Sequence, residues 1–139
     1  MAAPPQYAAS LALIREAQVR IAPFAKVTPV HTCATLNALV SDDDVDVELY
    51  FKCETFQKGG AFKFRGAVNA VMCLTETEAS KGVVTHSSGN HAGALALAAG
   101  VRGIPSYIVV PEGCPQCKLD AIATYGGVIT RCRPTVSDR

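Results

Sequence analysis

The chain has 139 residues, of which 49% are hydrophobic and 18% are charged, and its formal net charge is +1. This length suits one domain with a buried core, and the composition suits a buried parallel sheet better than a disordered tail. The near-neutral charge gives no electrostatic reason to expect nucleic acid or a membrane surface as a partner, and no apolar run is long enough to span a bilayer.

Apolar spacing predicts helices and strands that alternate along most of the chain. Helical spacing of Leu11, Ile14, Ala17 and Ile21 predicts the first helix. The predicted helices are 10–22, 32–39, 61–74, 90–99 and 115–125, and the predicted strands are 47–53, 82–86, 106–110 and 128–132. Strands that alternate with helices of about ten residues favour a parallel α/β sheet.

The amino terminus gives an expectation about location. Residues 1–6 lack the basic start and the apolar stretch of a secretion signal. The alanines leave a transit peptide open, but Glu16 and the helical spacing fit a domain helix better. We therefore expect a cytoplasmic protein.

Lys63 is the first candidate functional residue. It lies between Phe62 and Phe64, at the start of the predicted helix 61–74. Apolar neighbours and the positive end of a helix dipole both disfavour an ammonium ion, so we expect Lys63 to be enclosed and its pKa to be lowered. A change from ~10.4 to ~7.5 requires about 4 kcal/mol. A neutral lysine can form a Schiff base, whereas the alternative interpretation is a solvated lysine on an amphipathic helix.

A polar segment, Ser87-Ser88-Gly89-Asn90-His91, is the second candidate. It follows the predicted strand 82–86 and opens an alanine-rich helix. Backbone N–H groups at a helix start, together with hydroxyl and amide side chains, form a site for a carboxylate or phosphate. The alternative is an ordinary helix cap, which needs one such residue. Several in a row favour a binding loop.

Together, the stretch Phe-Lys-Phe-Arg-Gly-Ala around Lys63 and the segment 87–91 resemble the pyridoxal-phosphate enzymes of fold type II, the tryptophan synthase β type. The resemblance is to the serine racemase and serine/threonine dehydratase branch. The first stretch is similar to the family's lysine attachment motif, and the second to its substrate-carboxylate loop. The resemblance also takes in 28–30, 49–58 and 104–111, and so covers most of the chain from about residue 10.

By position, this resemblance implies a role for each candidate residue. Lys63 would hold pyridoxal 5′-phosphate as an internal aldimine and later act as a base at the substrate α-carbon. Asn90 would bind the ring hydroxyl of the cofactor, and the loop 87–91 as a whole would bind the substrate carboxylate. Ser88 would be the second acid/base, on the opposite face of the carbanion, which favours serine racemase. One shared intermediate would also allow elimination of water from serine.

The resemblance further implies an α/β fold, with a parallel twisted sheet flanked by helices, that forms the N-terminal part of a two-domain enzyme. Residues 1–81 would begin the large domain, and residues 82–139 would form most of the small domain that closes over the substrate. The implied substrates are L-serine, D-serine and L-threonine, and the implied assembly of a full-length form is a homodimer. No metal ligand is assigned here, and a divalent cation is left open for a full-length form.

Family enzymes are much longer than this chain. Their glycine-rich phosphate loop, the residue that faces the pyridine nitrogen and the cation ligands all lie downstream of the residues present. We therefore expect a fragment or truncated form that holds the nucleophile but lacks the phosphate anchor.

Two further clusters have chemical potential. Asp42, Asp43, Asp44 and Asp46 lack the ordered spacing of a cation site, which favours a solvated turn. The motif Cys114-Pro-Gln-Cys117 follows a predicted strand and opens a helix, a context that lowers a thiol pKa in redox motifs. A zinc site would need more ligands at suitable spacing.

Three hypotheses follow. The first is a pyridoxal-phosphate-dependent serine racemase with serine/threonine dehydratase (ammonia-lyase) activity, present as a truncated chain. The second is a catalytically incomplete interaction or regulatory fragment that pairs with a complete subunit. The third is a thiol-redox protein that uses Cys114 and Cys117.

Overall fold

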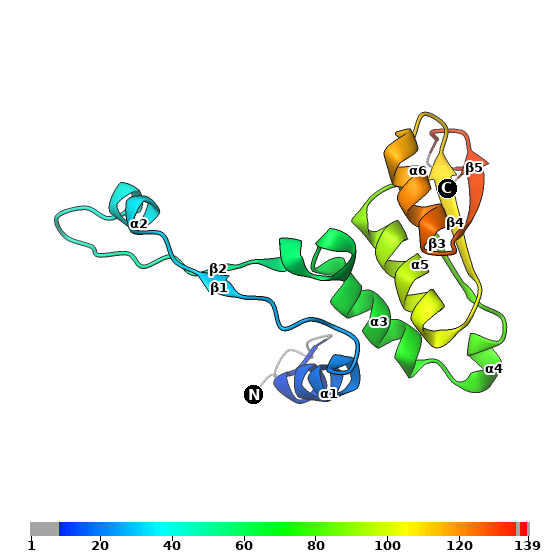
Figure 1. Ribbon diagram of the computed structural model, residues 1–139, viewed down its shortest axis with the longest axis horizontal. Coiled ribbons are helices and arrows are strands. Elements are labelled where there is room, and N and C mark those ends of the chain that lie inside the picture. The colour runs from blue at the N-terminus through cyan, green and yellow to red at the C-terminus, as the bar shows by residue number, and fades with distance from the viewer. Residues whose placement is uncertain (1–8, 136, 139) are drawn as a thin grey trace, which may run out of the picture.

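A computed structural model describes residues 9–135 and 137–138, so the expectation about residues 1–6 lies outside the described part. Helices and strands alternate over most of its length (Figure 1). The elements are α1 (Leu11–Ile21), β1 (Val30–His31), α2 (Ala34–Val40), β2 (Phe51–Lys52), the 3-10 turns η1 (Glu54–Phe56) and η2 (Lys58–Gly60), α3 (Lys63–Cys73), α4 (Glu76–Ala79), β3 (Val83–His86), α5 (Asn90–Arg102), β4 (Ser106–Pro111), α6 (Gln116–Thr124) and β5 (Val128–Cys132).

The centre of the fold is a parallel sheet in the order β3-β4-β5. Val83 pairs with Ser106 at the start of β3, and Tyr107 pairs with Val128 at the start of β5. Helices α5 and α6 connect these strands, and α3 packs against α5 (Figure 1). The predicted parallel α/β sheet is therefore confirmed for its last three strands.

Apolar packing is concentrated in the second half of the chain. All described apolar side chains that are buried lie between Ala61 and Ile122. From α3, Phe64, Val68 and Val71 form one helical face, and they meet the small alanine side chains of α5. Small residues let the two helices approach closely, so the start of α3 is brought near the start of α5.

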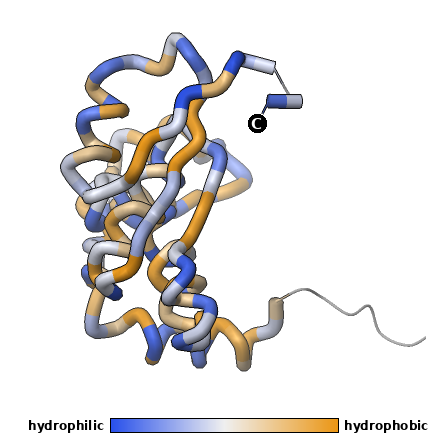
Figure 2. Tube along the Cα trace, turned by 90° about the vertical axis from the view of Figure 1, so that its right-hand side faces the viewer, coloured by the Kyte–Doolittle hydropathy of each residue, from blue (hydrophilic) through white to orange (hydrophobic). Residues whose placement is uncertain are grey.

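Most described residues in the first half of the chain are exposed to solvent. Neither α1 nor α2 has a buried residue. Figure 2 shows hydrophobic residues on the strands of the sheet, and also on α1 beside the grey amino-terminal trace. Residues 30–52, which we call the arm, extend away from the core in Figure 1. None of the described helices is long and apolar enough to cross a membrane.

The predicted strand 47–53 is wrong in length and in partner. Only Phe51–Lys52 is a strand, and it pairs antiparallel with β1 instead of joining the parallel sheet. Local side chains bind the backbone before it: the Ser41 hydroxyl accepts from the Val47 amide at 2.9 Å, and Asn37 Oδ1 accepts from the Leu49 amide at 3.0 Å. Such bonds compete with the pairing of strands.

Helix ends follow capping chemistry. Ser10 caps α1, as the predicted helix 10–22 requires, and Gly103 ends α5 in a left-handed conformation with φ 74°. The short helix α4 was not predicted, although Thr75 and Glu78 form a capping box whose sequence signature was present. The domain boundary near residue 81 stays a prediction.

Candidate active site

Lys63 is the first residue of α3. Gly59 and Gly60, with φ values of 71° and 70°, turn the chain just before it, and Phe62 precedes the helix without a side-chain cap. The side chain of Lys63 is exposed, and its Nζ lies 5.1 Å from the centre of the Phe62 ring.

The expected apolar enclosure of Lys63 is therefore wrong for the described residues. Phe64 is fully buried, but Phe62 is 59% exposed. Successive residues of a helix point about 100° apart, so two phenylalanines on either side of a lysine in the sequence do not enclose it in space.

The candidate carboxylate loop lies at the carboxyl end of β3, as expected. The Ser87 amide donates to the Val109 oxygen at 3.0 Å, which ties the loop to β4, and the Ser87 hydroxyl accepts from the Gly89 amide at 3.3 Å. Gly89 is the N-cap of α5 and has no side chain to cap it, so the amides of Asn90 and His91 are left for an acceptor other than the described residues, whereas the Ala92 amide donates to the Gly89 oxygen at 3.0 Å. The Cys114 thiol donates to the Ser88 oxygen at 3.9 Å.

The fold brings Lys63 and His91 together. Both line a pocket of about 240 Å³, with Phe62, Gly66 and Ala67 as the other lining residues. Lys63 comes from the start of α3 and His91 from the start of α5, so the packing of these two helices creates the pocket. A primary amine thus shares a cavity with the residue that ends the candidate carboxylate loop.

The other loop residues are placed differently. Asn90 and Gly89 line a second, smaller pocket of about 100 Å³, together with Gly59, Lys118 and other residues in and just after α5 and α6. The structure therefore does not put Asn90 in the same cavity as Lys63. Consecutive residues at a helix start face different directions, and sequence adjacency to His91 gave no indication of this.

The residues present fit part of pyridoxal 5′-phosphate. An amine, hydroxyls, an amide and uncapped helix amides provide the donors and acceptors that an aldehyde, a ring hydroxyl and a carboxylate require. A methyl group added to Gly66 would meet no other protein atom within 4 Å, so this wall of the Lys63 pocket leaves free space.

A polar network next to Lys63 was not predicted. Glu54 accepts hydrogen bonds from Arg65 at 2.7 and 2.8 Å and from the Thr28 hydroxyl at 2.5 Å. These bonds, that of Arg65 first, lower the pKa of the Glu54 carboxyl to about 2. The sequence carried one signal, because Glu54 and Arg65 are opposite charges within segments that take part in the resemblance, but their pairing depends on the fold.

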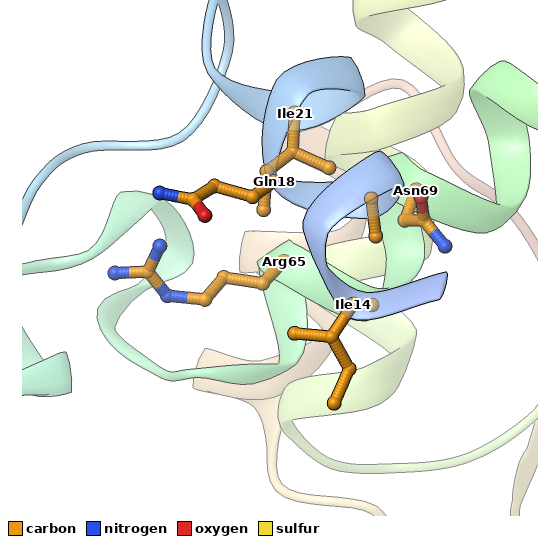
Figure 3. A pocket seen from close by; sticks show the side chains of 7 residues that line it. Ile14, Gln18, Ile21, Arg65 and Asn69 are labelled. Carbon is orange, nitrogen blue, oxygen red and sulfur yellow. The ribbon is translucent and has the colours of Figure 1, made fainter. Parts of the chain in front are cut away.

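Arg65 also lines a groove between α1 and α3, of about 390 Å³ (Figure 3). Ile14, Gln18 and Ile21 of α1 form one wall of this groove, and Asn69 of α3 lies on the other. The Arg20 side chain donates to Asn69 Oδ1 at 2.7 Å and joins the two helices.

The two remaining clusters are the acidic segment 42–46 and the motif Cys114–Cys117. Asp42 Oδ1 accepts from the amides of Asp44 and Val45, which makes a local turn. Among the described residues, no group of three or more His, Cys, Asp or Glu side chains is arranged to hold a metal ion. Cys114 and Cys117 are both free thiols.

Comparison with known proteins defines the class to which this fold and site belong. The family described as pyridoxal-phosphate dependent enzyme matches residues 21–139. The chain therefore belongs to this enzyme family, and its structural neighbours place it in fold type II, as the resemblance of its motifs predicted.

Individual relatives indicate the branch of the family to which the chain is most similar. The chain is 54% identical over 134 residues to serine racemase of Arabidopsis thaliana, which covers 96% of this chain and 39% of that protein. It is 51% identical over 123 residues to beta-hydroxyaspartate dehydratase of Paracoccus denitrificans, over 88% of this chain and 38% of that protein. The predicted serine racemase and dehydratase branch is confirmed by these names.

The chain is also similar to solved structures of proteins from the same branch. Maize serine racemase has a TM-score of 0.88 at 49% identity, over 95% of this chain and 39% of that one. The processed form of threonine deaminase isoform 2 from Solanum lycopersicum has a TM-score of 0.76 at 30% identity, over 94% of this chain and 38% of that one. The chain spans about two fifths of the length of these relatives.

Proposed function

We propose that this chain carries the lysine-bearing and carboxylate-binding part of a pyridoxal-phosphate-dependent serine racemase that also acts as a serine/threonine dehydratase. The observation that carries the proposal is the shared pocket of Lys63 and His91. Family membership and the names of the relatives support it. L-Serine, D-serine and L-threonine are the proposed substrates.

Lys63, Asn90 and the loop that ends at His91 would hold the cofactor and the substrate. When bound, pyridoxal 5′-phosphate supplies an electron sink that stabilises a carbanion at the α-carbon. The Lys63 amine would remove the α-proton from its side of the pocket, and in the reverse direction of the reaction it would supply the proton to that side. The uncapped amides at the start of α5 bind the carboxylate and orient it.

Ser88 is the proposed second proton carrier. Its hydroxyl would deliver a proton to the face of the α-carbon opposite Lys63, which inverts the configuration. The Ser88 backbone oxygen accepts a hydrogen bond from the Cys114 thiol, and the neighbouring Ser87 amide donates one to β4. Two hydrogen bonds therefore fix the position of the loop. A homodimer, which the resemblance implies for a full-length form, and a cytoplasmic location are further parts of the proposal, and a divalent cation is left open for a full-length form.

The test is covalent capture of the cofactor by Lys63. The chain is incubated with pyridoxal 5′-phosphate and reduced with borohydride, and the labelled lysine is located by peptide mass spectrometry. We expect one dominant label, on Lys63, which disappears in Lys63→Ala. Lys58→Ala is the matched control, because Lys58 lies nearby with its Nζ 5.8 Å from the Phe64 ring. Equal labelling of many lysines, or a full label in Lys63→Ala, would refute the proposal.

A second candidate function is that of an interaction fragment that pairs with a complete subunit. The exposed apolar side chains of α1, among them Leu11, Ile14 and Val19, favour it. Co-purification with a full-length serine racemase, together with no cofactor capture by the chain alone, is the result that would select this function over the first.

A further inference from the structure

Arg65 lies in the first turn of α3, the turn that also carries Lys63. Its guanidinium donates two parallel hydrogen bonds to the carboxylate of Glu54, from Nε to Oε2 at 2.8 Å and from Nη2 to Oε1 at 2.7 Å. Nη2 also donates to the backbone oxygen of Lys26 at 3.1 Å. Paired bonds of this kind fix the orientation of the guanidinium as well as its distance.

The carboxylate of Glu54 is itself held in place. The Thr28 hydroxyl donates to it at 2.5 Å, and Lys52 Nζ donates to the Thr28 oxygen at 2.7 Å. The Gln57 side chain binds both backbone groups of Lys26, accepting from its amide at 2.9 Å and donating to its oxygen at 2.8 Å. Thr28 and Gln57 are buried, so this network is a rigid support for Arg65.

The first turn of α3 is therefore anchored at two neighbouring residues. Phe64 is fully buried in the core, and Arg65 is bound to the network. Because these residues point about 100° apart, the two anchors together fix the rotation of the turn about the helix axis. The same rotation sets the direction in which Lys63 leaves the helix toward the pocket that it shares with His91.

We propose that Arg65 is a positioning residue for Lys63, and that its bidentate bond to Glu54 fixes the rotation of the first turn of α3. Among the described residues, Arg65 is not part of the lining of the Lys63 pocket, so it acts through the helix and not by contact with the cofactor. This inference rests on the proposed function, in which Lys63 is the residue that captures the cofactor.

Arg102, the last residue of α5, supplies a control, because it contacts α3 at the end opposite to Arg65. It donates to the backbone oxygen of Val71, near the end of α3, and to Glu76 at 2.9 Å. Like Arg65, it joins α3 to a glutamate outside that helix. Arg102→Gln removes an arginine–glutamate ion pair, here a single bond to an exposed carboxylate, without touching the first turn of α3.

The test compares the rate at which pyridoxal 5′-phosphate labels Lys63, after borohydride reduction, across pH 6 to 9 in the full chain and in Arg65→Gln, Glu54→Gln, Arg65→Lys and Arg102→Gln. We expect Arg65→Gln and Glu54→Gln to lower the rate about tenfold and to alter its pH profile. Arg65→Lys keeps the charge without the paired geometry and should restore part of the rate. Arg102→Gln should stay within about twofold of the unaltered chain.

Amide hydrogen exchange provides a readout that does not involve the cofactor. Arg65→Gln should raise exchange across residues 64–67, and Arg102→Gln should not. If Lys63 is labelled selectively in the unaltered chain but equally fast in Arg65→Gln, the inference fails while the proposed function stands. If the unaltered chain shows no selective label, the proposed function fails, and with it the role of Arg65 toward Lys63. Thermal unfolding of each variant identifies any loss of fold.

Discussion

Glu54 is the acidic group with the clearest structural reason for a changed acidity. Its carboxylate accepts from Arg65 and from Thr28, and its side chain is 17% exposed. The hydrogen bond from Arg65 is the largest cause of the lowered pKa, which lies at about 2 instead of 4.5. The network thus favours the ionised carboxylate strongly in the folded chain.

Replacement of Glu54 should change the pH dependence of stability. A carboxyl whose pKa falls on folding stabilises the fold above its unfolded pKa and loses this contribution as the pH falls toward the folded pKa. We expect Glu54→Gln to lower the free energy of unfolding by about 1 kcal/mol at pH 7, since Arg65 is partly exposed. The difference from the unaltered chain should shrink between pH 4.5 and about 2. Urea unfolding at several pH values measures it.

Glu16 offers the control for this experiment. It lies on the exposed surface of α1. Glu16→Gln should follow the unaltered chain at every pH. A Glu54→Gln variant that does the same would show that the ion pair with Arg65 contributes nothing measurable to folding.

The packing of β5 against its neighbours depends on a small residue at its start. A Cβ atom on Gly127 would lie 2.7 Å from Ile122 Cγ2, and 3.2 Å from atoms of Ala96 and Ile108. These three side chains come from α6, α5 and β4, and all are buried. Gly127 therefore allows two helices and a strand to converge at one point.

Gly127→Ala should destabilise the chain by about 1–3 kcal/mol, because a core that is already filled must shift to admit a methyl group. Gly100→Ala is the matched control. Its added Cβ would make an ordinary contact of 3.5 Å with the Tyr125 oxygen, and alanine is the better residue inside α5 by up to about 1 kcal/mol. Denaturant unfolding measures the free energy of unfolding of both variants. If Gly127→Ala and Gly100→Ala have equal free energies of unfolding, the account of β5 packing is contradicted.

Stability is distributed unevenly over the molecule. Apart from Ala61 and Ala79, the buried apolar side chains among the described residues come from α3, α5, β4 and α6, whereas α1 and the arm supply none. The arm is bound to the rest of the chain through a polar contact, because Lys52 Nζ donates to the Thr28 oxygen, and the Thr28 hydroxyl in turn contacts Glu54 and Arg65. Local opening should therefore begin in the arm and leave the core folded.

Two proline substitutions test this difference. Proline inside a helix removes a backbone hydrogen bond and clashes with the preceding turn. Ala38→Pro breaks α2, which buries no residue, so the melting temperature should fall by less than about 5 °C. Ala98→Pro breaks α5 where its side chain is fully buried, and the core should be lost. Thermal unfolding followed by circular dichroism measures both, and a large drop for Ala38→Pro would show that the arm belongs to the core.

Prediction from the sequence succeeded where the signal was local. The strand over Val128–Cys132 has the predicted bounds, and the strand over Val83–His86 begins one residue later than predicted. Both strands were predictable because β-branched runs between turn residues specify such strands directly. Lys63 and His91 were both predicted, and the structure brings them to one pocket. The role of Ser88 and the domain boundary remain predictions.

By itself, the sequence determined the family, the alternation of strands and helices, and the two segments that meet at the candidate site, because motifs and periodicity are read within a few residues. Only the tertiary structure decided that Lys63 is exposed, that Asn90 faces another pocket, and that Arg65 binds Glu54 and Thr28. Those last contacts join residues 11 and 37 positions apart. Exposure and pairing over such separations depend on how helices pack, and no local pattern encodes that packing.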